Sequence, residues 1–374
     1  MKNTIKLLAV IAIISIIGFT MIVCDSSGGG GGGEGPGTGP GTGPGTGPGI
    51  GGGGTVWTAV AGNTSALFYD DSAYTIGYGN GKFIAGGERG SMAYSTDGIT
   101  WIAVGDSKFG TSRIRATSYG NNKLIAGGND GKMATSSDGI TWAAVGDSKF
   151  GTSSNNINAI VYGNDKFVVV GNSGKMAYSI DDGVTWTAIS NSAFGTTPIQ
   201  AIAYGNGKFV AGSDNGKMAY SPDGVTWSAV ANSPFSNFIT VNSIAYDNGK
   251  FVAVGFGQWQ NGGKMAYSSD GITWTAVAET KNPFYYPYTL EDDEYIVFAD
   301  SAANIWAVAY GNGKFVAVSY GGKTAVSSDG STWTVAAETV FGREYYDGTV
   351  SIAYGNDKFV AIAADGKFAY WDGN

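Results

Sequence analysis

The stretch INAIVYGNDKFVVVGNSGKMAYSIDDGVTWTAI, residues 157–189, decides the fold. It contains four short runs rich in apolar residues, at 157–162, 166–170, 175–178 and 185–189. Three turn sequences separate these runs: Gly163-Asn164-Asp165, 171–174 and Asp181-Asp182-Gly183. Short apolar runs that alternate with turns rich in Asn, Asp and Gly are typical of β-hairpins. The stretch therefore predicts one up-and-down, four-stranded antiparallel sheet.

The same pattern recurs along the chain with a period of roughly 42 residues. It can be followed through the tryptophan that precedes each fourth run: Trp57, Trp101, Trp142, Trp186, Trp227, Trp274 and Trp333. A propeller blade of four strands needs about this length. One such sheet alone would leave two apolar faces exposed, so neighbouring copies must stack on it. The repeat therefore predicts an array of stacked sheets.

The two ends of the repeat region indicate how the array closes. Six copies of the third and fourth strands are complete, whereas the last copy, from Ile352 to Trp371, stops after its third strand. Residues 55–60 form an isolated fourth strand at the start. Joining the two ends in one sheet removes the exposed edges that a ring would otherwise carry. We therefore expect an all-β domain at 55–374, a seven-bladed β-propeller of four-stranded antiparallel blades closed by its N-terminal strand.

The first 24 residues form a signal-like segment. Lys2 and Lys6 precede an apolar run at 7–23, and the run ends at Cys24, the only cysteine of the chain. This arrangement resembles a bacterial lipoprotein signal peptide, which implies that Cys24 is lipidated and becomes the mature N-terminus. A secretory signal or a short transmembrane anchor are the alternatives. Lipidation implies a protein of the bacterial cell envelope, at the outer membrane, the cell surface or the periplasmic side.

Residues 25–54 consist almost entirely of Gly, Pro, Thr and Ser. Such a segment has too few apolar side chains to offset the entropy of ordering, so we expect a disordered tether. A Gly-rich chain of this length averages about 30 Å end to end. The tether would hold the propeller away from a membrane surface.

The turn before each tryptophan carries a family resemblance. Ser179-Ile-Asp181-Asp-Gly183-Val-Thr185-Trp186 resembles the Asp-box of BNR-type propellers, a repeat shared by sialidases and many non-enzymatic relatives. The residues suit a structural role, because Asp accepts backbone N–H groups, Gly permits a positive φ and Trp packs between sheets. The six turns are centred on Asp97, Asp138, Asp181, Asp223, Asp270 and Asp329.

Composition excludes several chemistries. The net charge is −8 and the isoelectric point is about 4.6, which disfavours binding to nucleic acid. The chain has no histidine, so Ser-His-Asp catalysis and His-ligated zinc are excluded. We expect no cofactor and no metal site. Calcium at Glu291-Asp292-Asp293-Glu294 is the alternative to a solvated acidic loop.

The resemblance to sialidases implies three arginines for the substrate carboxylate, an Arg-Ile-Pro motif and a Tyr/Glu pair. The chain has four arginines: Arg89, Arg113, Arg115 and Arg343. Ser112-Arg113-Ile114-Arg115 lacks the proline, and Arg89 and Arg343 fall in loops of distant blades. A pair of loop carboxylates could support glycosidase chemistry, and the candidates are Glu88, Glu291, Glu294, Glu338 and Glu344. We expect a non-enzymatic protein, with a glycan-cleaving hydrolase as the alternative.

Topology sorts the loops onto two faces. The Y-G-N-G-K turns and the Asp turns share one face, here called the Asp-turn face, and they repeat closely. The second-to-third-strand turns and the connections between blades share the other, the variable face. Most connections keep a phenylalanine eight residues after the tryptophan, which predicts a plug between blades: Phe109, Phe150, Phe194, Phe235 and Phe341.

Irregular insertions on the variable face carry clustered aromatic residues beside acids and amides. Rigid rings give contact area at low entropic cost, so we expect a ligand site there. Its residues are Trp259, Tyr285, Tyr286, Tyr288, Tyr345 and Tyr346. The sequence thus predicts a monomeric, envelope-tethered propeller that binds a protein or a glycan. An envelope assembly factor is a further alternative.

Overall fold

Seven four-stranded antiparallel sheets, joined by turns and short connections, form the part of the chain that the structure, a computed structural model, describes. The described residues are 56–62, 64–69, 72–151, 154–235, 239–257, 263–284, 304–319, 321–336, 341 and 349–373. All of them belong to the second of two units into which the chain separates, at 1–51 and 52–374. Within these ranges, no helix is long and apolar enough to cross a membrane. Cys24 and the expected tether lie outside them and stay predictions.

The first four blades follow the chain in order. Blade 1 consists of β2 (Ala73–Gly79), β3 (Lys82–Gly87), β4 (Met92–Ser95) and β5 (Ile102–Ala103). Blade 2 consists of β6 (Ile114–Gly120), β7 (Lys123–Gly128), β8 (Met133–Ser136) and β9 (Ala143–Ala144). Blade 3 consists of β10 (Ile157–Gly163), β11 (Lys166–Gly171), β12 (Met176–Ser179) and β13 (Thr187–Ala188). Blade 4 consists of β14 (Ile199–Gly205), β15 (Lys208–Ser213), β16 (Met218–Ser221) and β17 (Ser228–Ala229).

The last three blades continue the order and close the ring. Blade 5 consists of β18 (Ile239–Asp247), β19 (Lys250–Gly257), β20 (Gly263–Ser268) and β21 (Thr275–Ala276). Blade 6 consists of β22 (Ile305–Gly311), β23 (Lys314–Ser319), β24 (Thr324–Ser327) and β25 (Thr334–Val335). Blade 7 consists of β26 (Thr349–Gly355), β27 (Lys358–Ala363), β28 (Phe368–Trp371) and β1 (Thr58–Ala59). Short 3₁₀ turns are η2 (Ser65–Leu67), η4 (Glu88–Gly90), η5 (Asn129–Gly131), η6 (Asn172–Gly174), η7 (Asp214–Gly216) and η8 (Glu279–Lys281).

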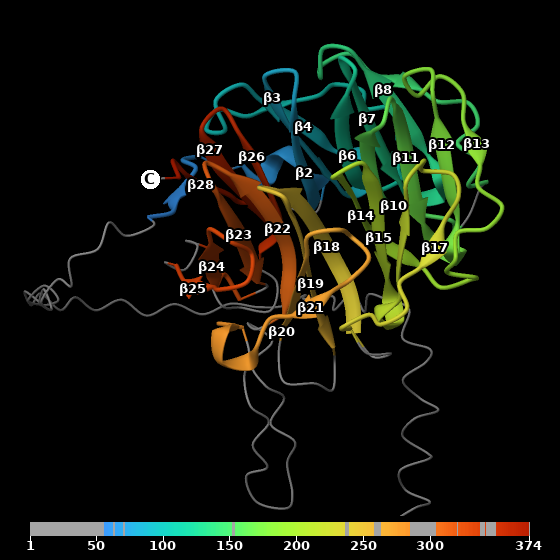
Figure 1. The fold of residues 1–374 in the computed structure, drawn as a ribbon. Helices are drawn as coiled ribbons and strands as arrows, with labels where there is room; N and C mark the ends of the chain where they lie inside the picture. The colour runs from blue at the N-terminus through green and yellow to red at the C-terminus, as the bar shows by residue number, and fades with distance from the viewer. Residues whose placement is uncertain are drawn as a thin grey trace, which may run out of the picture. The chain divides into compact units, whose positions relative to one another are not determined.

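The N-terminal strand closes the ring, as the sequence predicts. Thr58 pairs with Tyr370 and Ala59 with Ala369, so β1 lies beside β28 in Figure 1, blue against red. The first strand of each blade contacts the first strands of both neighbouring blades, and β26 contacts β2. The seven first strands, β2, β6, β10, β14, β18, β22 and β26, are therefore the inner strands around a central axis. The prediction of a seven-bladed propeller closed by its N-terminal strand is confirmed.

A glycine at the end of six of the seven inner strands permits the close approach of neighbouring blades. A Cβ built on Gly120 would lie 2.4 Å from the Tyr162 Cβ of blade 3, and one on Gly355 would lie 2.1 Å from the Tyr78 ring of blade 1. The same contact joins Gly79 to Tyr119. The Tyr-Gly pair that opens each Y-G-N-G-K turn is thus a contact between blades. Blade 5 departs from the pattern, because Asp247 takes the place of the glycine.

The core lies between the sheets rather than inside one central cluster. Each second strand is buried on both faces, as the fully buried Phe167 of β11 illustrates. The predicted tryptophans pack there too, since Trp142 and Trp186 are only 3% exposed. In blade 7 the Phe359 and Trp371 rings stack at 5.3 Å. Each blade is therefore stabilised by apolar surface that its neighbours cover.

The six Asp turns share one pattern of hydrogen bonds. In the first, Asp97 Oδ1 accepts the backbone N–H groups of Ile99 and Thr100, at 2.8 and 2.6 Å. The Ser95 hydroxyl donates to Asp97 and accepts the N–H of Gly98, whose φ is +75°. These turns shorten the fourth strands below the sequence prediction. In blade 3, for example, Thr185 donates its N–H to Asp181, so β13 begins only at Thr187.

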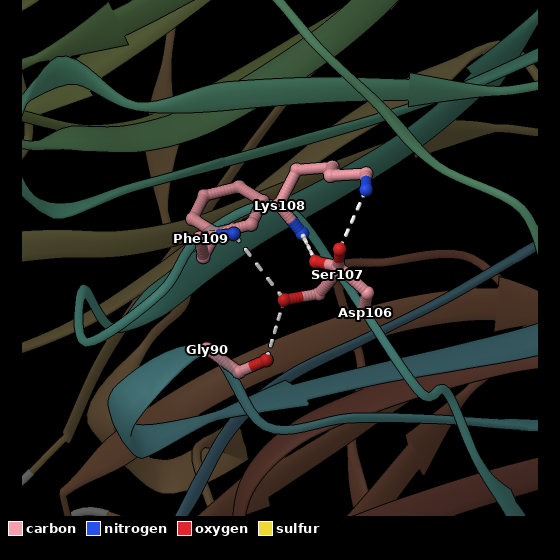
Figure 2. A network of polar contacts seen from close by, with 5 residues as sticks. All are labelled: Gly90, Asp106, Ser107, Lys108 and Phe109. Atoms are coloured by element: carbon pink, nitrogen blue, oxygen red, sulfur yellow. Dashed lines mark hydrogen bonds and ion pairs between the residues drawn. The ribbon is translucent and has the colours of Figure 1, made fainter.

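The connections between blades form a second repeated structure, shown for blade 1 in Figure 2. The Ser107 hydroxyl donates to the Gly90 carbonyl at 2.6 Å and accepts the N–H of Phe109. The Phe109 ring is then fully buried. Ser148 and Ser233 make the same bond to Gly131 and Gly216.

The phenylalanines predicted to plug the blade junctions are all buried: Phe109, Phe150, Phe194, Phe235 and Phe341. The connection after blade 5 lacks a phenylalanine at that spacing. Asn282 stands there instead, and its side chain donates to the Gly263 carbonyl at 2.8 Å. Phe284, two residues later, is fully buried in place of the missing ring.

Candidate functional site

The Asp-turn face is held together by bonds from each blade to the next. In each case an Asn or Lys at the turn between the first and second strands of one blade donates to the Asp turn of the following blade. Within the described residues blade 7 has no Asp turn, and there the acceptor is Gly373. The pairs are Asn80 to Ser137, Asn121 to Asp182, Lys166 to Asp223, Asn206 to Ser269, Asn248 to Ser328, Asn312 to Gly373 and Asn356 to Thr96. Polar side chains on this face are therefore engaged in the scaffold.

The inner strands carry a different feature near the variable face. In every blade the pairing between first and second strands shifts by one residue at the same place, as between Ile157 and Ala159 of β10. The extra residue of such a β-bulge is unpaired, and bulges often re-aim side chains beside functional sites. The seven residues, here called the axial rim, are Tyr74, Arg115, Asn158, Gln200, Asn242, Trp306 and Val350. All seven are half-buried.

The rim residues of blades 2–4 bond the residue fourteen positions later, which is the first residue of the turn between the second and third strands. Arg115 Nε donates to Asn129 Oδ1 at 2.5 Å. Asn158 donates to Asn172 at 3.1 Å and Gln200 donates to Asp214 at 3.1 Å. In blade 1 the same two positions hold Tyr74 and Glu88, which are close enough to interact electrostatically. Bulge and turn thus position a pair of polar side chains in each of four consecutive blades.

Arginine and tyrosine side chains gather at blades 1 and 2. Arg113 bonds Glu88 at 2.6 Å, and its guanidinium lies over the Tyr74 ring at 3.9 Å. Arg89 lies over the Tyr69 ring at 4.0 Å. Three of the four arginines of this acidic protein therefore come from these two blades, at the 88–89 turn and the start of β6. Arg343 lies outside the described residues.

Burial disfavours charge at two rim residues, Arg115 and Tyr74, and at Asp214 in the turn of blade 4. It lowers the pKa of Arg115, and the nearby positive charge of Arg113 lowers that pKa further. Burial also raises the pKa of the Tyr74 phenol, which keeps the phenol protonated at neutral pH. Burial raises the pKa of Asp214, although the bonds from Gln200 and Thr240 oppose this effect. Of these groups, Tyr74 and Arg115 are close enough to interact electrostatically, and perturbed groups that gather in one place mark a candidate functional site.

The rest of the rim differs in character. In blades 6 and 7 it is apolar: the Trp306 ring lies 5.6 Å from the half-buried Phe256 ring, and Val350 packs against the core of blades 7 and 1. In blade 5, Asn242 donates to the Ile305 carbonyl of the next blade at 2.8 Å. The order around the axis is therefore amides in blades 3–5, apolar side chains in blades 6 and 7, and Tyr74 and Arg115 in blades 1 and 2.

The ligand site predicted from the sequence lies outside the described residues. This applies to each of Trp259, Tyr285, Tyr286, Tyr288, Tyr345 and Tyr346, and to the acidic loop at 291–294. Among the described residues, no group of three or more Asp, Glu, His or Cys side chains could hold a metal ion. The axial rim was missed by the sequence reasoning. Its signal is a position that varies from copy to copy inside an otherwise repeated inner strand.

Comparisons with known proteins agree with the fold. Residues 137–243 match the family model described as the DUF6242 beta propeller domain. No curated protein sequence matches the chain significantly. The matched segment covers less than a third of the chain, so it supports a β-propeller and nothing narrower.

Solved structures with similar folds include a binding protein and enzymes. The structure described as YCF48 bound to D1 peptide aligns with a TM-score of 0.60 and 16% identity, over 84% of this chain and 94% of that chain. YCF48 from Cyanidioschyzon merolae aligns with a TM-score of 0.57 and 15% identity, over 84% and 98%. The GH74 xyloglucanase from Xanthomonas campestris aligns with a TM-score of 0.60 and 14% identity, over 84% of this chain but 53% of the enzyme. At these identities the likeness shows the fold alone.

Proposed function

We propose that this protein is a non-enzymatic binding propeller of the bacterial cell envelope, and that it binds a polypeptide at the axial rim. One observation carries the proposal: the inner strands repeat in sequence and register, but the bulge residue differs between blades. Six residue types occupy its seven positions. A position that served only closure of the ring would be expected to repeat like the tyrosine at the far end of the same strand.

The chemistry of the rim supports a polypeptide ligand. Amide side chains can bond a peptide backbone, and half-buried aromatic rings give an apolar side chain contact area. Peptide binding is compatible with this fold, because the YCF48 structure is described as bound to D1 peptide. If the captured polypeptide is a subunit of a larger complex, the protein would act in envelope assembly. The predicted loop residues, Trp259 and Tyr286 among them, would extend the site.

Photo-crosslinking tests this proposal on the full-length protein. A photoreactive amino acid placed at Trp306 should crosslink a polypeptide in cells, whereas the same residue at Ile140 on the Asp-turn face should not. Trp306→Ala should weaken binding of the captured partner about thirtyfold, since a buried aromatic anchor is worth about 2 kcal/mol. Ile140→Ala, a substitution of an exposed side chain, serves as the matched control. Crosslinks from Ile140 alone would show that the opposite face binds.

Attachment to the membrane is the second part of the proposal. The lone cysteine between an apolar segment and a Gly-rich tether supports lipidation at Cys24, and the six Asp turns support a place among Asp-box propellers. Cys24→Ser should release the protein from the membrane fraction. Continued tight association with the membrane would favour the alternative of a simple apolar anchor.

A glycan-cleaving hydrolase is the competing function, and one cluster favours it. Arg113 contacts both Glu88 and the Tyr74 ring beside the rim, where a phenol, a carboxylate and a guanidinium could act on a sugar. The raised pKa of Tyr74 argues against a phenolate nucleophile. A panel of chromogenic glycosides would decide: turnover that Glu88→Gln abolishes would establish the hydrolase and overturn the non-enzymatic proposal.

A further inference from the structure

Two guanidinium groups at the rim are served by a single carboxylate. Glu88 bonds Arg113 at 2.6 Å, and the positive charges of Arg113 and Arg115 are close enough to repel each other. Arg115 bonds a neutral partner, the side-chain amide of Asn129. Within the described part of the chain, no ion pair involves Arg115. The group formed by Arg113, Arg115 and Glu88 therefore has two guanidinium groups and one carboxylate.

This arrangement is unfavourable in the free protein. A half-buried cation loses part of its hydration. The free-energy cost of that loss is offset only by an opposite charge or by several hydrogen bonds. Asn129 accepts a hydrogen bond only from Nε of Arg115. The two terminal nitrogens of the guanidinium are therefore available to donate two parallel hydrogen bonds to a carboxylate. An anion at this place would relieve both the desolvation of Arg115 and its repulsion by Arg113.

The neighbours of Arg115 around the rim indicate what the anion is attached to. Going around the ring from Arg115 of blade 2, the next three rim residues are Tyr74 of blade 1, Val350 of blade 7 and Trp306 of blade 6. Equivalent positions on three adjacent inner strands thus carry an aromatic or aliphatic side chain, here called the arc, and the next position carries a cation. On the other side, the amide nitrogens of Asn158 and Asn242 donate to the Ile199 and Ile305 carbonyls. Their amide oxygens are acceptors suited to backbone N–H groups of a ligand.

We propose that Arg115 anchors a carboxylate of the polypeptide ligand, next to an apolar side chain that contacts the arc of Tyr74, Val350 and Trp306. The inference rests on the proposed function, because it names the ligand chemistry of the same site. The carboxylate is the chain terminus or the side chain of Asp or Glu, and the test distinguishes these two sources.

Paired peptide arrays test the anchor with the full-length protein in detergent. One array presents random hexapeptides with a free C-terminal carboxylate, and the second presents the same peptides as C-terminal amides. Retention that requires the free terminus identifies the chain end as the anchor. Retention in both arrays that requires Asp or Glu within the peptide identifies a side chain. The best peptide is then titrated against variants.

Arg115→Gln is the informative variant, because glutamine can still donate to Asn129 but carries no charge. It should weaken the best peptide at least about tenfold, and Arg115→Lys should restore part of that loss. The same peptide without its carboxylate should bind wild type and Arg115→Gln equally weakly. Lys149→Gln is the matched control, since Lys149 is a cation of the same face already paired with Asp147 at 2.6 Å.

The outcomes separate the anchor from the proposed function. If peptides are retained without regard to any carboxylate, and Trp306→Ala weakens them, the rim binds polypeptides but Arg115 is not an anchor. If Arg115→Gln leaves the affinity of a carboxylate-dependent peptide unchanged, the carboxylate binds elsewhere and the inference is wrong. If neither array retains the wild-type protein, polypeptide binding itself fails and the anchor fails with it.

Discussion

Single aspartates hold the turns of the Asp-turn face. Asp138 shows the cause clearly: its Oδ1 accepts the N–H groups of Thr141 and Ile140 at 2.7 and 2.8 Å. These bonds favour the charged carboxylate and lower its pKa to about 2. The pKa values of Asp97 and Asp223 also fall to about 2, because backbone N–H bonds outweigh the effect of burial. The turns therefore depend on ionised aspartate.

The lowered pKa of Asp138 predicts a pH dependence of stability. In the unfolded chain an aspartate titrates near about 3.9, so the folded state binds its proton less readily. The stabilising effect is complete above about pH 4 and is lost as the pH falls toward 2. Asp138→Asn should therefore lower the free energy of unfolding at pH 6, and the difference from wild type should shrink at pH 2.5. Urea unfolding at both pH values measures it.

Asp165→Asn is the control for this prediction, because it removes the same charge from another turn of the same face. If Asp165→Asn reproduces the pH dependence seen with Asp138→Asn, the effect comes from net charge rather than from the turn. A gap that stays constant between pH 6 and pH 2.5 would likewise contradict the assignment.

At the scale of the structural elements, the connection between blades 1 and 2 depends on one buried hydroxyl. Ser107 bonds the Gly90 carbonyl at 2.6 Å and is 5% exposed (Figure 2). Ser107→Ala leaves that carbonyl without this donor and should lower the free energy of unfolding by about 1 kcal/mol. Lys108→Gln breaks the exposed ion pair with Asp106 in the same connection and should change it by less than about 0.5 kcal/mol. Equal effects of the two variants would mean that the hydroxyl does not hold the connection.

Strands and bulges differ in how far the sequence reveals them. The inner strand of blade 3 could be predicted because Ile157 to Tyr162 is an apolar run that ends at a turn. Its bulge could not, because the shift between Ile157 and Ala159 depends on pairing with β11 rather than on residue type. Asn158 therefore looked like an ordinary strand residue, although it is a rim residue. The length of β13 was overestimated for a similar reason, since hydrogen bonds to Asp181 compete with strand pairing.

At the scale of the whole molecule, the repeat predicts the propeller and its closure because each blade needs neighbours on both faces. The Trp57 side chain shows the consequence at the seam, being 4% exposed and lying in the core of blades 6 and 7. The site follows no such rule. The rim arises where seven copies of one bulge meet around the axis, and the charged side chains beside it, such as Arg113 and Glu88, come from different blades. These residues come together only in the closed ring, so the sequence of a single repeat does not reveal the site.

Closure by β1 gives a prediction that concerns the entire ring. The Val60 N–H donates to the Phe368 carbonyl at 2.9 Å, and the Trp57 ring lies 6.1 Å from the Trp371 ring. Trp57→Ala removes a buried indole from this seam and should lower the free energy of unfolding by about 3 kcal/mol or more. Val56→Ala, one residue away at a side chain that is 68% exposed, should leave it nearly unchanged. Because the ring has one seam, loss of β1 should also speed proteolysis of blade 7 before blade 3. If Trp57→Ala melts at the wild-type temperature, the N-terminal strand does not hold the propeller closed.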